Sequence, residues 1–375
     1  MKVLHIITGL GDGGAEQTLF KICKYDIKNN HIVISLLGPG KYYSLLKNLG
    51  IKVYCLNVNY YSINKLFFLI KLIRLLKPQI IQTWLVHADL VGGIAAKISG
   101  FKNIIWNVRY SNFKIGKAKL LTILIVKLLA KLSFFIPKSI IVVSKKSKKI
   151  YENKGYDKKK LIFIPNGYDL SIFRPNYRKK IIFRKKIKIK KNVPLIGNIA
   201  RFDPKKDHSN LLNALSIIKS KNIRFLCVLV GSNINMKNSK LMSQIKKLKL
   251  AKNVKLLGQK KNVTKIMSAI DLYVQSSRYG EGFPNVVAES MACETPSIAT
   301  NVGDASIIIG KTGWIIPPNN SIKLSKAIES AIIEIGTKKW IRRCKKTRIR
   351  IKQNYDINIM LKSYSSLWNK VYNTL

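Results

Sequence analysis

Two glutamates, Glu281 and Glu289, stand at the ends of the string EGFPNVVAE and could act together on one ligand. The apolar run that begins at Leu272 predicts a buried strand before them. A glycine on each side of Glu281 permits a tight backbone path, and Pro284 suits the start of a helix over 286–293. A strand, a glycine loop and a helix in this order aim backbone N–H groups at an anion. A diphosphate on that helix end would lie between two carboxylates, which could accept hydrogen bonds from sugar hydroxyls.

A basic pair follows another predicted strand, over 194–200. Arg201 and Lys206 are five residues apart and come just before a predicted helix. When a bond to a diphosphate breaks, negative charge grows on the phosphate oxygens, and fixed cations stabilise it. In so basic a chain, the pair taken alone is better explained as ordinary surface charge.

The first half of the chain offers a second set of candidates at the ends of predicted strands. Gly13 and Gly14 lie in the loop GLGDGGAE after a strand over 2–8, and His87 follows a strand over 80–84. Ligands of α/β sheets bind beyond the carboxyl ends of the strands. The glycines would then lie beside a diphosphate or an acceptor. A structural glycine turn and a structural loop histidine are the alternatives.

The string EGFPNVVAE, the GGAE loop and the segment IPNGYDLSIFRP over 164–175 resemble glycosyltransferase family four, a family of retaining enzymes with the GT-B fold. The resemblance spans nearly the whole chain. It implies that Glu281 positions the hydroxyls of a donor sugar and that Glu289 holds the ribose. The other site residues that it implies are His87 at the donor sugar or its phosphate, Arg201 and Lys206 at the diphosphate, main-chain groups of Phe283, Pro284 and Asn285 at the sugar, Gly258 at the nucleobase, and Gly13 and Gly14.

The expected fold is α/β, because predicted strands and helices alternate along the whole chain, as in parallel sheets covered by helices. The resemblance implies two Rossmann-like domains that face each other across a cleft, with a C-terminal helix that crosses back to the first domain. We place an acceptor domain at 1–175 with the returning helix 356–375, a linker at 176–190, and a donor domain at 191–355.

Composition indicates an anionic partner. The chain has 69 Lys and Arg against 17 Asp and Glu, a net charge of +52. An anionic membrane surface and the drift of an AT-rich genome explain this equally well, whereas no RNA-recognition signature supports a specific nucleic acid. The stretch 117–137 predicts either an amphipathic helix in a membrane interface or a helix that covers a sheet. Five scattered cysteines, no signal peptide and no spanning run predict a cytoplasmic protein, peripherally bound to the inner face of the plasma membrane.

We therefore expect retaining transfer of a hexose or N-acetylhexosamine from a nucleotide-diphosphate sugar, in particular a UDP-sugar. The acceptor would be a lipid-linked or cell-surface glycan, such as a polyprenyl-diphosphate-linked one. No cofactor or metal is expected, because no two acidic residues are two positions apart and the metal-binding Asp-x-Asp pattern is absent. The alternatives are an inactive GT-B scaffold, a nucleic-acid-binding protein, and a GT-B epimerase or phosphorylase.

Overall fold

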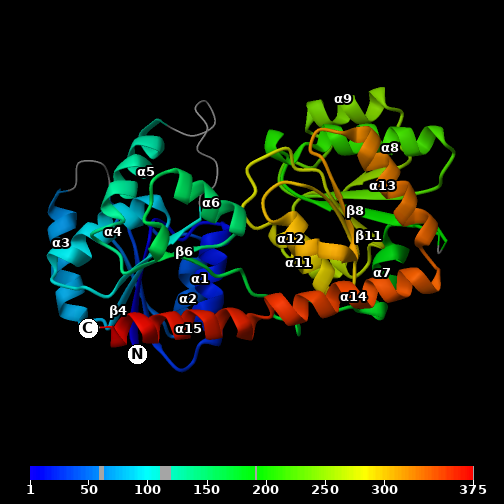
Figure 1. Ribbon diagram of the computed structural model, residues 1–375. Coiled ribbons are helices and arrows are strands. Elements are labelled where there is room, and N and C mark those ends of the chain that lie inside the picture. The colour runs from blue at the N-terminus through cyan, green and yellow to red at the C-terminus, as the bar shows by residue number, and fades with distance from the viewer. Residues whose placement is uncertain (59–62, 110–119, 191, 375) are drawn as a thin grey trace. The chain divides into compact units, whose positions relative to one another are not determined.

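The computed structural model describes residues 1–58, 63–109, 120–190 and 192–374, and they form two compact units (Figure 1). Unit 1 comprises Met1–Gly167 and Asn358–Leu375, and unit 2 comprises Tyr168–Ile357. Each unit has its own parallel sheet and its own buried apolar cluster. The first three residues of the predicted helix over 117–137, and residue 191 of the predicted donor domain, lie outside the described residues.

Unit 1 is built on a seven-stranded sheet in the order β3-β2-β1-β4-β5-β6-β7. Its strands are β1 (Lys2–Ile7), β2 (Asn30–Ser35), β3 (Lys52–Cys55), β4 (Ile80–Trp84), β5 (Ile104–Val108), β6 (Ser139–Val142) and β7 (Leu161–Phe163). Its helices are α1 (Gly14–Tyr25), α2 (Lys41–Lys47), α3 (Ile63–Leu76), α4 (Val86–Ile98), α5 (Leu120–Leu132), α6 (Lys145–Asn153), the 3-10 helix η1 (Lys158–Lys160) and α15 (Ile357–Asn373).

Unit 2 is built on a six-stranded sheet in the order β10-β9-β8-β11-β12-β13. Its strands are β8 (Leu195–Ile199), β9 (Leu226–Val230), β10 (Val254–Leu256), β11 (Leu272–Gln275), β12 (Ser297–Thr300) and β13 (Trp314–Ile316). Its helices are α7 (Tyr177–Lys186), the 3-10 helix η2 (Pro204–Lys206), α8 (His208–Ser220), α9 (Ser239–Lys247), α10 (Thr264–Met267), α11 (Asn285–Ala292), α12 (Ala305–Ile309), the 3-10 helix η3 (Gly310–Thr312), α13 (Ser321–Glu334) and α14 (Lys338–Tyr355).

Both sheets have a point where the direction of strand addition reverses. In unit 1 it lies between β1 and β4, and in unit 2 between β8 and β11. The loops that leave the carboxyl ends of such a strand pair turn away from each other and leave room for a ligand. This topology confirms the predicted α/β fold with two Rossmann-like domains, and it selects the loops in which a site is expected.

The last helix, α15, belongs to unit 1, as the predicted returning helix requires (Figure 1). Trp368 is fully buried, and its indole N–H donates a 2.8 Å hydrogen bond to Oε1 of Gln82 in β4. The hydroxyl of Tyr364 accepts a 2.9 Å bond from the amide of Asn107 in β5. Buried aromatic side chains with satisfied polar ends therefore hold this helix on the unit 1 sheet.

The segment that the sequence assigns to a linker, 176–190, is largely helical and belongs to unit 2. Helix α7 is fixed there by Asp271, whose two carboxylate oxygens lie 2.8 Å from Nζ of Lys180 and 2.9 Å from the Arg184 guanidinium. The lysine and arginine run indicates a linker and the entry to the second domain. In the structure, two of these cations pair with the carboxylate that immediately precedes β11, and the units divide earlier, after Gly167.

Helix α5 packs on the unit 1 sheet, and one of its sides stays exposed. Val126, Leu129 and Ala130 are buried against unit 1, as in a helix that covers a sheet. Four leucines on the outer side are exposed instead, and they are Leu120, Leu121, Leu124 and Leu128. The helix therefore contributes to the core and still presents an apolar stripe to its surroundings.

Candidate functional site

The loops that follow β8 and β11 form the candidate site of unit 2. The loop after β8 carries Arg201 and Lys206, and the loop after β11 carries Glu281. Two hydrogen bonds join these loops, from Ser276 Oγ to the carbonyl of Lys206 (2.8 Å) and from Arg278 N to the carbonyl of Lys205 (2.7 Å). The reversal of strand order thus brings together residues that are 75 positions apart in the sequence.

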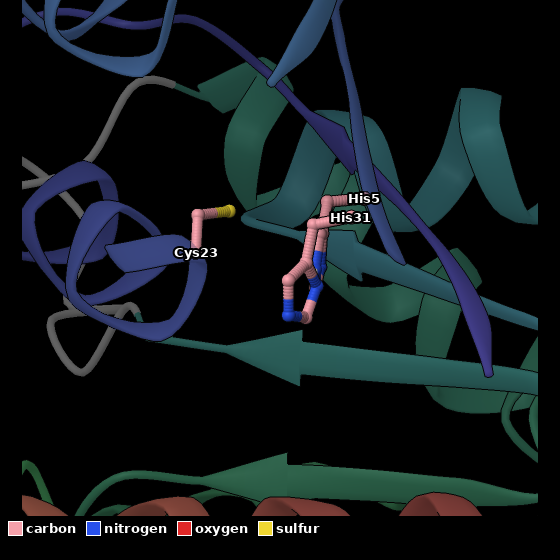
Figure 2. A group of neighbouring side chains, drawn as sticks. All are labelled: His5, Cys23 and His31. Carbon is pink, nitrogen blue, oxygen red and sulfur yellow. The ribbon is translucent and has the colours of Figure 1, made fainter. Parts of the chain in front are cut away.

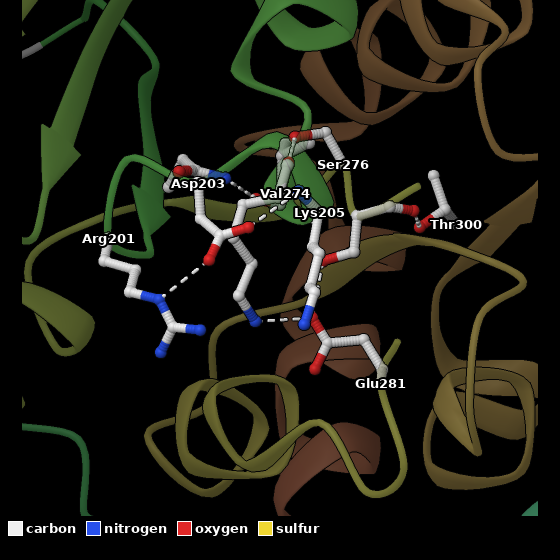
Figure 3. Close-up of polar contacts among 10 residues, drawn as sticks. Arg201, Asp203, Lys205, Val274, Ser276, Glu281 and Thr300 are labelled. Carbon is white, nitrogen blue, oxygen red and sulfur yellow. Dashed lines mark hydrogen bonds and ion pairs between the residues drawn. The ribbon is translucent and has the colours of Figure 1, made fainter. Parts of the chain in front are cut away.

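Lys206 and Glu281 form the central contact of this site. Nζ of Lys206 donates to Oε1 of Glu281 at 2.5 Å, and the hydroxyl of Ser277 donates to the same oxygen at 2.7 Å. Figure 3 shows Glu281 beside the loop that carries Lys205. A carboxylate held by an ammonium group and a hydroxyl has a fixed position, and its second oxygen can still accept hydrogen bonds.

Arg201 lies at the outer side of the same loop. Its Nε is 3.1 Å from Oδ2 of Asp203, and its side chain is 63% exposed (Figure 3). Asp203 also accepts a 2.9 Å bond from the backbone N–H of Lys205, which caps η2. The Asp203 hydrogen bonds from Lys205 and Arg201 lower the pKa of that carboxyl even though burial opposes them. Asp203 therefore orients the Arg201 guanidinium through Nε, and the rest of the guanidinium is open to solvent.

Helix α11 begins at Asn285, one residue before the predicted range 286–293, and Pro284 is its N-cap. No side chain caps this helix end. Glu289 lies on the second turn and is 6% exposed. Burial raises the pKa of Tyr273 well above its ordinary value, and the charges of Glu281 and Glu289 add to this shift.

Phe283 is held within unit 2 rather than directed into the site. Its ring is 8% exposed and lies 5.4 Å from the Tyr355 ring and 6.4 Å from the Tyr168 ring. The Tyr168 hydroxyl donates a 2.6 Å bond to Oδ1 of Asn285. These contacts anchor the loop by its aromatic side chain, which leaves only main-chain groups of Phe283 for a ligand.

Gly303, which the sequence analysis did not single out, packs against the loop that carries Glu281. Its φ is +58°, and a Cβ atom there would lie 2.4 Å from the carbonyl oxygen of Gly282. Asp304 N donates to the same oxygen at 2.9 Å. Gly280 has a φ of +79°, as its place in a tight loop predicts. The turn after β12 therefore packs against the glutamate loop so closely that a side chain is excluded.

A cavity of about 40 Å³ lies where these elements meet, and its lining includes Lys206, Glu281, Pro284 and Asn285. Four predicted residues are thus brought together, whereas Arg201, Phe283, Glu289 and Gly258 do not line it. The rest of its lining includes two side-chain amides, those of Asn198 in β8 and Gln275 in β11.

Asn198 and Gln275 are buried polar residues at the ends of apolar strands, a signal that the sequence reading did not use. Oδ1 of Asn198 and both amide atoms of Gln275 have no hydrogen-bond partner among the described residues. Buried amides without partners cost free energy, and a bound hydroxyl or water would satisfy them.

Gly258 lies at the carboxyl end of β10, at the same edge of the sheet as the loops after β8 and β11 but farther along it. Its φ is +67°, its N–H donates to the carbonyl of Ile234 at 3.0 Å, and its carbonyl accepts from Gly231 N at 3.0 Å. Gly231 in turn approaches the loop after β8 so closely that a Cβ atom would lie 2.2 Å from the carbonyl oxygen of Ala200. Gly258 is thus tied to the loops that carry the site.

In unit 1, His87 is the second residue of α4, directly after β4, and it is half-buried. Leu85, the N-cap, has an unusual φ of +74°, which marks a sharp turn from strand to helix. Ala88 N donates to the hydroxyl of Thr8, in the loop after β1, at 3.3 Å. His87 therefore lies at the reversal point of the unit 1 sheet, next to the glycine loop.

Asp89, two residues after His87, is fully buried, and Thr83 Oγ1 donates to its Oδ1 at 2.5 Å. Burial raises the pKa of this carboxyl to about 7, and hydrogen bonds from Thr83 and the backbone of Asn107 oppose the shift. The neutral acid is therefore favoured in the folded protein over much of the acidic range.

Gly13 is the N-cap of α1, and Gly14 is its first residue. The space beside Gly13 is filled by Glu16, since a Cβ atom at Gly13 would lie 2.4 Å from a carboxylate oxygen of that residue. A carboxylate at a helix N-terminus is itself a stabilising partner. An anionic ligand at Gly13 and Gly14 would have to share this helix end with Glu16.

Arg109, which follows β5, is occupied by contacts within unit 1. Its guanidinium donates to Oδ1 of Asn107 (3.0 Å), Oγ1 of Thr18 (3.0 Å), Oδ1 of Asn166 (2.8 Å) and the hydroxyl of Tyr364 (3.1 Å). These partners come from β5, α1, the segment after β7, and α15. Arg109 thus joins four parts of unit 1 at one point.

His5, Cys23 and His31 bring three potential metal-ligand atoms within 4.8 Å of one another (Figure 2). The indole N–H of Trp84 donates to His5 Nδ1 at 3.2 Å, which places the proton of neutral His5 on Nε2. That nitrogen lies 3.0 Å from His31 Nδ1, and His31 Nε2 lies 3.3 Å from Asp26 Oδ2. A metal ion needs the lone pair of His5 Nε2, so this hydrogen-bond order favours a proton-ordered chain over a metal site.

Comparisons with known proteins cover both units. The family model described as Glycosyltransferase Family 4 matches residues 12–172, and the model described as Glycosyl transferases group 1 matches residues 179–347. The chain is 27% identical over 276 residues to the UDP-Gal:alpha-D-GlcNAc-diphosphoundecaprenol alpha-1,3-galactosyltransferase of Escherichia coli, which covers 71% of this chain and 70% of that protein. It is 26% identical over 300 residues to the capsular polysaccharide biosynthesis glycosyltransferase CapM of Staphylococcus aureus, with 78% and 77% covered.

Among solved structures, the Anabaena protein HepE in complex with UDP has a TM-score of 0.87 over 99% of this chain and 100% of that one, at 21% identity. That likeness shows the GT-B fold. Together the two family models match most of both units, and both relatives are named as glycosyltransferases. The chain is a glycosyltransferase and belongs to glycosyltransferase family 4.

Proposed function

We propose that this glycosyltransferase moves a hexose or N-acetylhexosamine, with retention of configuration, from a UDP-sugar to a lipid-linked glycan. The observation that carries the proposal is the contact between Lys206 and Glu281 at a small cavity beside the uncapped end of α11. A cation, a carboxylate and the N–H groups of a helix N-terminus are the groups that a sugar diphosphate needs.

In this proposal the donor diphosphate binds at the N-terminus of α11, with Arg201 and Lys206 as its cations. As the bond between the anomeric carbon and the diphosphate oxygen breaks, negative charge passes to that oxygen, and the two cations stabilise it. Glu281 accepts hydrogen bonds from the sugar hydroxyls, and Glu289 from the ribose. A further hydroxyl of the donor, or a water molecule, forms hydrogen bonds with the side-chain amides of Asn198 and Gln275.

Unit 1 binds the acceptor in this proposal, with His87 and the Gly13–Gly14 turn at the reversal point of its sheet. The acceptor hydroxyl attacks the anomeric carbon and loses its proton to an oxygen of the leaving diphosphate on the same face. This arrangement requires no metal ion and no cofactor. The named acceptor of the Escherichia coli relative, a diphosphoundecaprenol-linked sugar, supports a polyprenyl-diphosphate-linked acceptor.

A lipid-linked acceptor requires contact with a membrane. No helix in the described part of the chain is long and apolar enough to cross one. The exposed leucines of α5 next to Lys127 and Lys131 support peripheral binding at an anionic inner leaflet instead. Flotation with anionic vesicles at low and high salt tests this part, and the absence of binding at both salt concentrations would remove it.

The donor is tested by thermal unfolding of the protein with a panel of nucleotide sugars, followed by release of the nucleotide over time. We expect UDP-sugars to raise the unfolding midpoint and one of them to be hydrolysed slowly without acceptor. Stabilisation by RNA, without hydrolysis of any nucleotide sugar, would favour the inactive scaffold or nucleic-acid-binding alternative.

A further inference from the structure

A second candidate binding site lies in unit 1, at the amino ends of its strands. A cavity of about 480 Å³ opens there, and its volume is within the range of small-molecule sites. Lysines dominate its polar lining, and they are Lys97, Lys102, Lys138, Lys159, Lys160 and Lys370. They come from α4, from the segments that lead into β5, β6 and β7, and from α15, so the fold gathers them from distant parts of the sequence.

Two of these lysines have structural partners. Lys138 donates to Oδ1 of Asn103 (2.9 Å) and to carbonyl oxygens at the end of α15. Lys160 donates to the carbonyls of Ser133 (2.9 Å) and Phe134 (2.7 Å), just after α5. Cations at the C-terminal ends of helices are stabilising, so these two lysines have a structural role as well as lining the cavity.

The other four, Lys97, Lys102, Lys159 and Lys370, are exposed, and we call them the open lysines. Within the described ranges, none of them has an ion pair, and Asp157 is the sole carboxylate within 4.0 Å of any of the six, at 3.8 Å from Lys160. Burial lowers the pKa of Lys160, and the positive charge of Lys97 adds to the effect, while Asp157 opposes it. The cavity therefore concentrates positive charge that a bound anion would neutralise.

Apolar side chains also line the cavity, and they include Phe135, Ile136, Ile162 and Val371. A site with an apolar wall and several ammonium groups fits an amphiphilic anion better than a bare one. Phosphate oxygens suit lysine ammonium groups as point-charge partners.

The position of this cavity separates it from His87. The open lysines lie at the amino edge of the sheet, whereas His87 follows β4 at the carboxyl edge. A five-residue strand is about 16 Å long, so a ligand in the cavity is beyond the reach of the reacting groups.

We propose that this lysine cavity binds the phosphate group of an anionic ligand, as a site separate from the donor diphosphate. The chemistry fits a phospholipid headgroup at a membrane surface and a free phosphorylated metabolite alike, and the experiment separates the two sources.

The test is acetylation of lysines in the whole protein, followed residue by residue with mass spectrometry. One arm adds pyrophosphate, and another adds vesicles of phosphatidic acid in phosphatidylcholine, with pure phosphatidylcholine as the blank. We expect the open lysines to be protected, while Lys28 and Lys52, which are exposed elsewhere in unit 1, are not. Protection of Lys206 reports the proposed donor site independently, so the two proposals can fail separately.

Protection by pyrophosphate alone identifies a soluble phosphate ligand, protection by vesicles alone a lipid headgroup, and protection by both a phosphate site that accepts either. Uniform acetylation of the open and the reference lysines in every arm would overturn the proposal.

Variants measure how much the cavity lysines contribute to the affinity for the phosphate ligand. The double variant Lys97→Gln/Lys370→Gln removes two cations of the cavity, and Lys28→Gln/Lys52→Gln removes the same charge elsewhere. Each lysine near a phosphate contributes about fivefold in affinity, so the first variant is expected to weaken binding by roughly 25-fold. The control should change it by less than about twofold. Equal weakening in both variants would show general charge attraction and contradict a built site.

Discussion

Lys206 and Glu281 are in hydrogen-bond contact at 2.5 Å although 75 residues separate them in the chain. The contact exists because β8 and β11 are neighbours at the point where the strand order of unit 2 reverses. The loop after β8 supplies the cation and the loop after β11 supplies the carboxylate. A sugar diphosphate bound there would meet both charges at once.

The first prediction concerns Glu281 itself. Glu281→Ala should lower nucleotide-sugar turnover by about 100-fold or more, because a fixed acceptor of sugar hydrogen bonds is lost. The unfolding midpoint should change little, since Lys206 can turn to solvent. Glu329→Ala is the matched control, because it also breaks a glutamate–lysine pair, with Lys221 at 2.6 Å. Turnover of Glu281→Ala close to that of Glu329→Ala would remove the assigned role.

The second prediction concerns the support of the glutamate loop. Gly303→Ala places a Cβ atom 2.4 Å from the carbonyl oxygen of Gly282 and strains a φ of +58°. We expect a loss of about 1–3 kcal/mol in the free energy of unfolding and lower turnover, because the loop must shift. Gly336→Ala has a φ of +91° with nothing within 4 Å of the new atom, so it reports backbone strain alone. Equal effects of the two variants on turnover would contradict a steric role of Gly303.

The third prediction is a pH dependence set by Asp89. Its pKa is raised from 3.8 to about 7 in the folded protein, so the folded state binds the proton more tightly than the unfolded state. The stability that this provides is present below pH 3.8 and is lost as the pH rises to 7. At roughly 1.4 kcal/mol for each pKa unit, the loss is on the order of 4 kcal/mol.

Asp89→Asn lacks this titration. In urea unfolding between pH 4.5 and 8, the stability advantage of the wild type over Asp89→Asn should therefore shrink as the pH rises. Titrations of other groups are common to both proteins and cancel in the difference. A difference that stays constant over this range would show that the carboxyl is not perturbed.

The fourth prediction concerns the contribution of Arg109 to the stability of unit 1. Arg109→Gln breaks bonds to Asn107, Thr18, Asn166 and Tyr364, and it should cost about 2–4 kcal/mol of stability. Arg74→Gln removes one 3.2 Å bond to the Ile98 carbonyl and should cost less than about 1 kcal/mol. Unfolding of both variants by denaturant measures this, and an equal cost would mean that the Arg109 contacts add nothing.

Much of the fold follows from the sequence, because buried strands and covering helices alternate in a pattern that few other architectures produce. The motif residues Lys206, Glu281, Pro284 and Asn285 are predicted from sequence and meet at one cavity. The roles of the site residues, and the domain boundaries, remain predictions.

Other features depend on tertiary contacts that a linear reading does not contain. The sequence predicts a linker over 176–190. In the structure, ion pairs with Asp271 hold α7 to unit 2. Gly303 is one of many glycines until the carbonyl of Gly282 is seen beside it. Gln275 is distinguished only as a polar residue at the end of an apolar strand, and its unsatisfied amide becomes evident only in the folded unit.

The central claim is that a nucleotide diphosphate binds at the N-terminus of α11, between Glu281 and Glu289. The most direct test is a crystal structure of the protein grown with UDP. The account predicts the diphosphate at that helix end, with the Arg201 and Lys206 side chains on its oxygens and the ribose at Glu289. A helix end without the diphosphate, while UDP occupies another part of the protein, would contradict it.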